Sequence, residues 1–401
     1  MKKNLILGFI FISVALNAQD YYGKLQNEAL ELIQKKNYTE SMARTKKILE
    51  VYPDLMLPNV FHAFNLINLG RVNEATPYIN YGLQAWPTNY LFYVLKAYEQ
   101  TANGNEENAR KYLMQSLFYR PQNSVTNELT DEIRLVGSNL NKPLFNSLAD
   151  WCDLQRKNLP PRQLTLDSAL NSFYANASSP DKVKELNLQF SQQFMKANRP
   201  EFSSFTYALA ARCLSTNGFK SEAIDLSIEG YQLFKKNGFA NNHELAASML
   251  LQIVNNFTAA SDYEHAIQYI DEILTHSDQL FAHTVDVESL IIASNCYRNL
   301  GNSGKAGEAA YAAYKLAEKH NYVYGITYAA NAICAALVSS YNSNENNLSI
   351  QYGESSLRLC EKYNIPMANE VRANLAFSYW NLGANGKQKA MDMYRSLIQK
   401  S

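Results

Sequence analysis

Along most of the chain, apolar residues recur every three or four positions, which is the spacing of one face of an α-helix. The stretch "NVFHAFNLIN" places Val60, Phe64 and Ile67 on one such face, and Gly70 follows it. A second helical stretch, "NEATPYINYGLQAW", ends directly before Pro87. Gly just past one helix and Pro just past the next are typical helix terminators. The pattern predicts a helix, a tight turn and a second, antiparallel helix.

This hairpin pattern recurs at a fixed interval of 34 residues. Four positions keep their residue type: a small residue in the first helix, Gly at the turn, a small residue in the second helix, and a final Pro. In that order they are Ala29, Ala63 and Ala97; Gly70 and Gly104; Ser41, Ala75 and Ala109; and Pro53, Pro87 and Pro121. Self-similarity at a fixed length indicates a repeat architecture.

These positions resemble the tetratricopeptide repeat (TPR), a helix–turn–helix unit of 34 residues. The resemblance covers residues 21–121 in three copies, with Asn59 and Tyr93 in place of the family Trp and Lys36 in place of the first turn Gly. It implies an all-α solenoid of stacked antiparallel hairpins. The first helices of such hairpins line a concave surface, where proteins of this family generally bind peptides or partner proteins.

The rest of the chain is also predicted to be helical. The same order of small residues and turn Gly returns over residues 201–401 at a longer, looser spacing, which predicts about five TPR-like repeats. Residues 122–200 contain four stretches with an apolar stripe each, so we expect degenerate hairpins between the two arrays. The run "NSNENN" at 342–347 is interpreted as a surface loop. Because no stretch alternates with the period of a strand, the predicted fold class is all-α.

The N-terminus has the form of a secretory signal peptide over residues 1–18. Two Lys residues precede an apolar run from Leu5 to Leu16, and small residues follow, so that cleavage after Ala18 or after Ala15 fits. The alternative is a membrane anchor, but the run is shorter than the ~20 residues needed to cross a bilayer. We therefore expect an exported protein, in the periplasm, secreted or associated with the cell envelope, without transmembrane insertion after cleavage.

Charge and cysteine content change this picture little. Removal of Lys2 and Lys3 from a chain with 37 basic and 37 acidic residues leaves a formal net charge of −2. Without a basic patch, nucleic acid is not an expected partner. The five Cys show no scaffold spacing. They are interpreted as small core residues, with one disulfide between Cys334 and Cys360 as the alternative.

No catalytic, metal or cofactor site is expected. The sequence "HELAA" from His243 resembles the start of a zinc-protease helix, but Ala247 stands where that helix needs its second His. The Gly-rich run 301–307 lacks the spacing of a phosphate-binding loop and follows a helix instead of a strand. Since no convergent set of titratable residues is visible, the chain is predicted not to be an enzyme.

The repeat register identifies the side chains that would face the concave surface. In the N-terminal array they are apolar and include Val60, Phe64, Ile67 and Tyr98. An exposed apolar patch usually marks a binding site. The alternative is that residues 122–200 fold back over this face, which would make these residues part of a core.

The C-terminal array presents polar side chains in the same register, namely Arg212, Asn255, Asn295 and Arg298, followed by the aromatic residues Phe377 and Trp380. An Asn amide both donates to and accepts from a peptide backbone. An Arg guanidinium binds a carboxylate. These residues are therefore the candidates for a polar peptide groove, unless they serve only to solvate long helices.

Together these features favour a non-catalytic scaffold or assembly factor that binds another protein or a peptide in the cell envelope or exported space. The alternative is a glycan-binding module or an envelope enzyme built on a helical-repeat scaffold. A clustered Asp/Glu pair or an aromatic platform on the concave face would favour that alternative.

Overall fold

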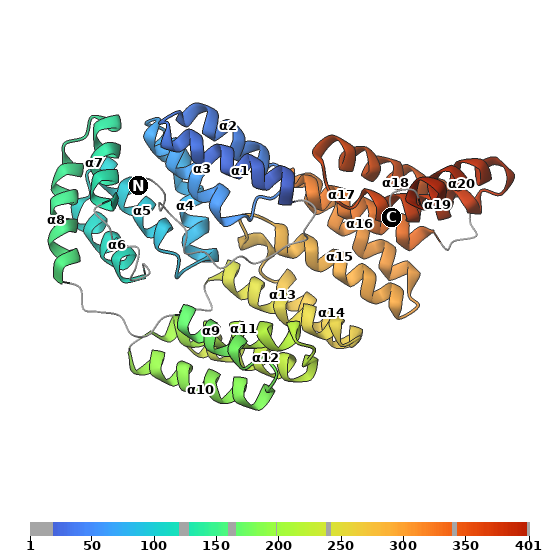
Figure 1. The fold of residues 1–401 in the computed structure, drawn as a ribbon. Coiled ribbons are helices and arrows are strands. Elements are labelled where there is room, and N and C mark those ends of the chain that lie inside the picture. Colours follow the sequence, from blue (N-terminus) through green and yellow to red (C-terminus); the bar gives the residue numbers. More distant parts are fainter. Residues whose placement is uncertain are drawn as a thin grey trace. The chain divides into compact units, whose positions relative to one another are not determined.

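The computed structural model describes residues 19–119, 128–158, 166–197, 199–237, 242–338 and 343–398. Within these ranges the chain forms twenty α-helices and one short 3-10 helix, with no strand, so the predicted all-α class is confirmed (Figure 1). Contacts divide the chain into two compact units. The first comprises Met1–Leu49, Asp54–Ala210 and Lys236–Leu245, and the second comprises Glu50–Pro53, Ala211–Lys235 and Ala246–Ser401.

The first unit is built from consecutive helix pairs, beginning with the three predicted repeats. Its helices are α1 (Gln19–Gln34), α2 (Tyr38–Leu49), α3 (Met56–Asn68), α4 (Val72–Ala85), α5 (Tyr90–Ala102), α6 (Glu106–Tyr119), α7 (Glu128–Leu140), α8 (Leu144–Asn158), α9 (Leu166–Ala175) and α10 (Pro180–Lys196). The four helical stretches expected over residues 122–200 correspond to α7, α8, α9 and α10.

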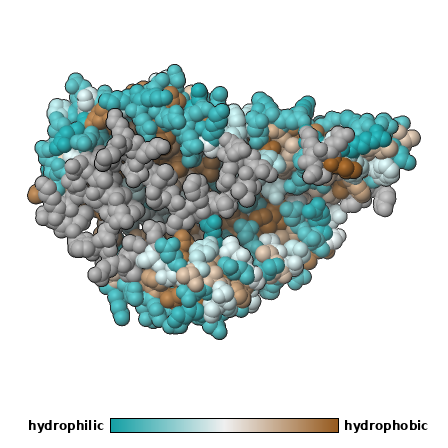
Figure 2. Space-filling view, viewed as in Figure 1, coloured by the Kyte–Doolittle hydropathy of each residue, from teal (hydrophilic) through white to brown (hydrophobic). Residues whose placement is uncertain are grey.

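The division between the units falls inside α11 (Pro200–Thr216). The helices that follow are α12 (Lys220–Lys236), α13 (His243–Ala259), α14 (Tyr263–Leu274), η2 (Ser277–Gln279), α15 (Thr284–Asn299), α16 (Ser303–Lys319), α17 (Val323–Leu337), α18 (Ser343–Tyr363), α19 (Ala368–Asn381) and α20 (Ala384–Ile398). Figure 2 shows hydrophilic residues over the outer surfaces of α2 and α20, as expected for helices with one buried stripe.

The small residues of the repeat register lie where paired helices cross. All six in the N-terminal array are fully buried: Ala29, Ala63, Ala97, Ser41, Ala75 and Ala109. In the first hairpin the Ser41 hydroxyl donates a hydrogen bond to the backbone oxygen of Ala29 over 2.9 Å. A side chain as short as Ser reaches the backbone of the neighbouring helix only when the two helices lie very close. The small residues therefore set the spacing of the hairpin.

After the first hairpin, the position two residues beyond the small residue of the first helix is also buried, and it joins successive hairpins. Asn65 of α3 donates a hydrogen bond from its amide nitrogen to the Ser41 hydroxyl of α2 over 2.8 Å. Asn256 of α13 makes the equivalent bond to Ser227 of α12 over 3.3 Å. A first helix is thereby tied to the second helix of the preceding hairpin.

Two cysteines occupy this same buried position, Cys213 and Cys296, in agreement with the interpretation of the cysteines as small core residues. Cys334 and Cys360 are buried as well, and no disulfide joins them in the structure. The Cys334 sulfur instead accepts a hydrogen bond from the Ser349 hydroxyl over 3.4 Å. Burial raises the pKa of each of these four thiols, to about 11 for Cys296 and Cys360.

Most of the described turns between paired helices contain a residue with left-handed backbone. Gly70 and Gly104 have φ values of 75° and 80°. The backbone N–H of Gly70 donates to the Ile67 oxygen over 2.9 Å, which closes the helix end in the usual manner for a glycine at this place. Lys36 takes the same role in the first turn, with φ of 60° and a bond from its N–H to the Ile33 oxygen over 2.9 Å.

Residues 343–347, which were expected to lie in a surface loop, are helical, because α18 begins at Ser343 and buries Asn346 within its first turns. Packing of this turn outweighs the low helix propensity of the Asn-rich run. The predicted signal peptide at 1–18 and Pro121 both lie outside the described residues. Among the described residues, no helix is long and apolar enough to span a membrane.

Replacing Lys36 with Gly is expected to stabilise the chain by about 0.5–1 kcal/mol. A residue with a Cβ atom loses ~1–2 kcal/mol in the left-handed region, and the greater freedom of Gly in the unfolded chain cancels part of the gain. Urea unfolding of the full chain measures the change in the free energy of unfolding. Gly70→Ala is the inverse control and should lose about 1 kcal/mol. A lower unfolding midpoint for Lys36→Gly would contradict this description of the first turn.

Candidate functional site

The apolar residues expected to line an N-terminal groove lie in a core. Val60, Ile67 and Tyr98 are only 6%, 0% and 0% exposed, and Phe64 is half-buried. They belong to one hydrophobic cluster with three residues of α7, which are Leu129, Ile133 and Val136. These three follow the i, i+4, i+7 spacing of one helix face. The expectation of an open groove therefore does not hold here, and α7 fills the concave surface instead.

The position of α7 follows from how its hairpin packs. Helix α8 contacts α5 and α6, whereas α7 contacts α3 and α5 (Figure 1). The Tyr98 hydroxyl donates a hydrogen bond to the Glu132 carboxylate of α7 over 2.8 Å. Asn139, near the end of α7, donates to the amide oxygen of Asn68 over 2.7 Å. The side-chain contacts therefore agree with the alternative in which residues 122–200 fold back over this face. The helix that covers it is α7.

The polar residues predicted for the C-terminal array all lie in the second unit and remain accessible to different degrees. Asn255 on α13 and Arg298 on α15 are exposed, while Arg212 on α11 and Asn295 on α15 are half-buried. The Arg298 guanidinium donates a hydrogen bond to the Asn295 amide oxygen over 3.2 Å, so the structure brings these two together. Arg212 and Asn255 hold the equivalent register positions on the preceding first helices.

Further polar residues extend this surface onto α17 and α19, and the sequence register did not identify them. Asn331 on α17 is 1% exposed and donates from its amide nitrogen to the Glu370 carboxylate over 2.8 Å. Asn374 on α19 donates in turn to the Asn331 amide oxygen over 3.0 Å. The hairpin α17–α18 lacks the turn Gly that fixes the register elsewhere, so its concave residues could not be assigned by counting from that position.

The pKa of Tyr328 on α17 reflects burial and the charged groups near the same surface. Burial is the main cause that raises the pKa of its phenol, and the carboxylates of Glu370 and Glu288 raise it further. The Arg298 guanidinium acts in the opposite direction. Charged groups from α15 and α19 thus both lie near enough to Tyr328 to influence its ionisation. We use the name C-terminal groove for the candidate surface marked on α13, α15, α17 and α19 by Asn255, Glu288, Asn295, Arg298, Tyr328, Glu370 and Asn374, together with the buried Asn331 that links Glu370 to Asn374.

The amides of this groove retain hydrogen-bonding capacity. Within the described part of the chain, the side-chain amide of Asn255 has no hydrogen-bond partner, and the amide oxygen of Asn374 has none either. Each amide oxygen accepts and each NH2 group donates, which is the combination a peptide backbone requires. No group of three or more His, Cys, Asp or Glu side chains that would hold a metal ion occurs among the described residues.

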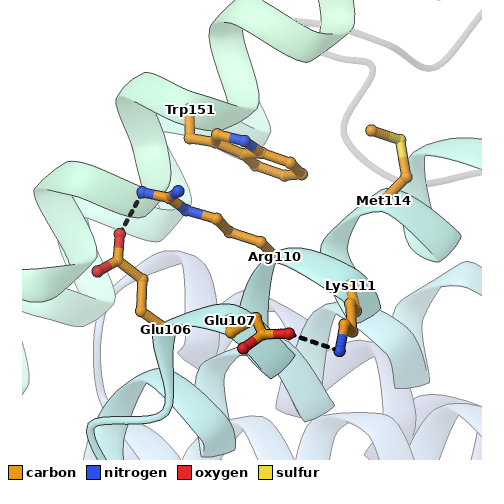
Figure 3. A pocket seen from close by; sticks show the side chains of 6 residues that line it. All are labelled: Glu106, Glu107, Arg110, Lys111, Met114 and Trp151. Carbon is orange, nitrogen blue, oxygen red and sulfur yellow. Dashed lines mark hydrogen bonds and ion pairs between the residues drawn. The ribbon is translucent and has the colours of Figure 1, made fainter.

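A separate depression of about 550 Å³ lies between α6 and α8 (Figure 3). Its lining residues are Glu106, Glu107, Arg110, Lys111, Met114 and Trp151. Arg110 lies with its guanidinium carbon 6.0 Å from the centre of the Trp151 ring and pairs with Glu106. Lys111 pairs with Glu107 over 2.8 Å. Both basic groups are already paired within α6, and the contact of Arg110 with Trp151 is interpreted as a brace between α6 and α8.

No protein-family model matches the chain, and no curated protein matches it. Solved structures that it resembles include the apo form of the quorum sensor NprR from B. thuringiensis, with 11% identity and a TM-score of 0.43 over 95% of this chain and 99% of that chain. A Rap protein complexed with Competence and Sporulation Factor shows 13% identity and a TM-score of 0.37 over 96% and 100%.

A putative kinesin light chain from Podosopora anserina with nearly identical TPR-like repeats shows 16% identity and a TM-score of 0.40, over 50% of this chain and 98% of that chain. The architecture itself rests on features of this chain, which are the paired helices, the left-handed turn residues and the buried small residues at the crossings. By these features the chain is a TPR-like helical-repeat protein.

Proposed function

We propose that the chain binds a peptide segment of a partner protein in an extended conformation, in the C-terminal groove, and that it does so without catalysis. The observation that supports this most is the row of amide side chains on α13, α15, α17 and α19, parts of which lack hydrogen-bond partners within the described residues. An extended peptide offers one N–H and one C=O per residue. Asn side chains satisfy both of these groups.

The proposal places binding in the second unit only. In the first unit the equivalent concave residues, such as Ile67 and Tyr98, are covered by α7 and cannot contact a partner without unfolding that helix. We further propose that the protein acts as a scaffold or assembly factor. A rigid array of hairpins can hold a bound segment while its other surfaces remain available to further partners.

Replacing Asn255 and Asn295 together with Ala is expected to weaken peptide binding by about 1–3 kcal/mol, because backbone groups of the ligand then lose their partners. Stability should stay within about 0.5 kcal/mol, as is usual at surface positions. The measurements are calorimetric titration with a peptide recovered from a random phage-displayed library, and the melting midpoint.

The matched control is Asn347→Ala with Asn385→Ala, two exposed amides on the second helices α18 and α20. This control should bind the peptide as the wild type does. A large fall in the melting midpoint of the Asn255 and Asn295 variant would mean that these residues are structural. Unchanged binding with unchanged melting would place the site elsewhere.

We also propose that the protein is exported to the periplasm, the cell envelope or the medium. The support is the order of two Lys residues, the apolar run Leu5–Leu16 and the small residues up to Ala18. Deletion of residues 2–18 is expected to retain the protein in the cytoplasm of a bacterial host. Cell fractionation and the mass of the N-terminal peptide are the measurements. A full-length chain that stays in the cytoplasm with its N-terminus intact would refute export.

A further inference from the structure

Two large aromatic side chains remain exposed beside the C-terminal groove. Phe377 and Trp380 of α19 are 46% and 45% exposed. Phe377 follows Glu370 and Asn374 at i+7 and i+3, so the carboxylate, the amide and the phenyl ring stand on one face of the helix. Because Glu370 and Asn374 are both hydrogen-bonded to Asn331, this face of α19 is continuous with the polar part of the groove. We call Phe377 and Trp380 the aromatic ledge.

The area of the ledge matches a single side chain. A large aromatic residue buries about 150–250 Å² when fully covered, so two rings that are nearly half exposed offer on the order of 200 Å². A stable contact between two copies of a protein needs about 800 Å² from each partner. The ledge is therefore far too small to sustain a dimer, and it is about the size of one Phe, Trp or Leu side chain.

One ring of the ledge, Trp380, is also restrained by a neighbouring side chain. The ammonium group of Lys387, in the first turn of α20, lies 5.0 Å from the centre of the Trp380 ring, within the range of a cation–π contact. An indole ring restrained in this way loses little further freedom when a ligand covers its other side. A fixed aromatic surface beside unpaired amides combines the two features that ligand sites need, which are apolar contact area and a few placed polar groups.

We propose that Phe377 and Trp380 form the subsite for one large apolar side chain of the bound peptide, next to the amides that hold its backbone. This inference rests on the proposed peptide-binding function. The ligand class is thus an extended peptide segment that carries an aromatic or large aliphatic residue. The amides contribute affinity for any backbone, and the ledge selects among sequences.

The test is selection of random peptides of about twelve residues, displayed on phage, against the full chain and its variants. Peptides recovered on the wild type should share one position enriched in Phe, Trp, Tyr, Leu or Met. The variant Phe377→Ser with Trp380→Ser should lose that enrichment and bind a selected synthetic peptide about 30-fold more weakly, as is typical when an interface anchor is removed. Phe281→Ser, at a Phe that is also 45% exposed but lies outside α19, is the matched control.

The emission of Trp380 gives a second measurement. The chain has three Trp residues, and the difference between the spectra of the wild type and Trp380→Phe isolates the signal of Trp380. Binding of the selected peptide should shift this difference spectrum to shorter wavelength and protect it from acrylamide quenching, because the exposed indole becomes covered.

The outcomes of these experiments distinguish the aromatic subsite from peptide binding in the groove. Recovery of no peptide would refute both. Peptides whose binding needs Asn255 and Asn295 but not the ledge would leave the groove in place and overturn the inference. If the wild type self-associates at micromolar concentration and the ledge variant is monomeric, the ledge is a contact between copies and the inference fails.

Discussion

Two antiparallel helices can lie in close contact along their length only if the residue at their crossing point is small. In this chain the requirement is met by residues such as Ala63 and Ala75, which are fully buried. The close approach lets short polar side chains tie the backbones together, as Ser41 does with Ala29. Within each unit it also lets neighbouring first helices lie side by side, so that their remaining faces share a surface. The concave surfaces of both units are consequences of this spacing.

The two units use that surface in opposite ways. In the first, α7 presents an apolar face that includes Ile133 and fills the groove, which converts a potential binding surface into core. In the second, Asn374 on α19 keeps an amide oxygen without a partner among the described residues, and Asn255 on α13 keeps its whole side-chain amide without one. Amides that lack partners are poor core material and good ligands for a peptide backbone. Side-chain packing therefore closes the first groove, and the amides of the second unit support the proposal that its groove binds a partner.

Much of the fold could be predicted from the sequence because the repeat places particular residue types at fixed positions. Ala63 and Gly70 occur at fixed distances, and each position has one physical cause, close helix approach for Ala and a left-handed turn for Gly. The placement of α7 could not be predicted in this way. Its apolar stripe is equally compatible with a helix of a regular repeat and with a helix that lies in the groove. Asn331 was missed for a related reason, because its hairpin has no turn Gly from which to count. Such features depend on contacts between distant residues, which spacing along the chain does not encode.

The rate of thiol labelling at new cysteines measures most directly whether one groove is closed and the other open. The native cysteines are buried, and burial raises the pKa of Cys296 and Cys360 to about 11, so the background reaction is slow. The account predicts that Asn255→Cys reacts at nearly the rate of a free thiol. Val60→Cys, beneath α7, should react at least about 100-fold more slowly, since labelling then requires local opening of the structure. Equal rates at the two positions would contradict the account.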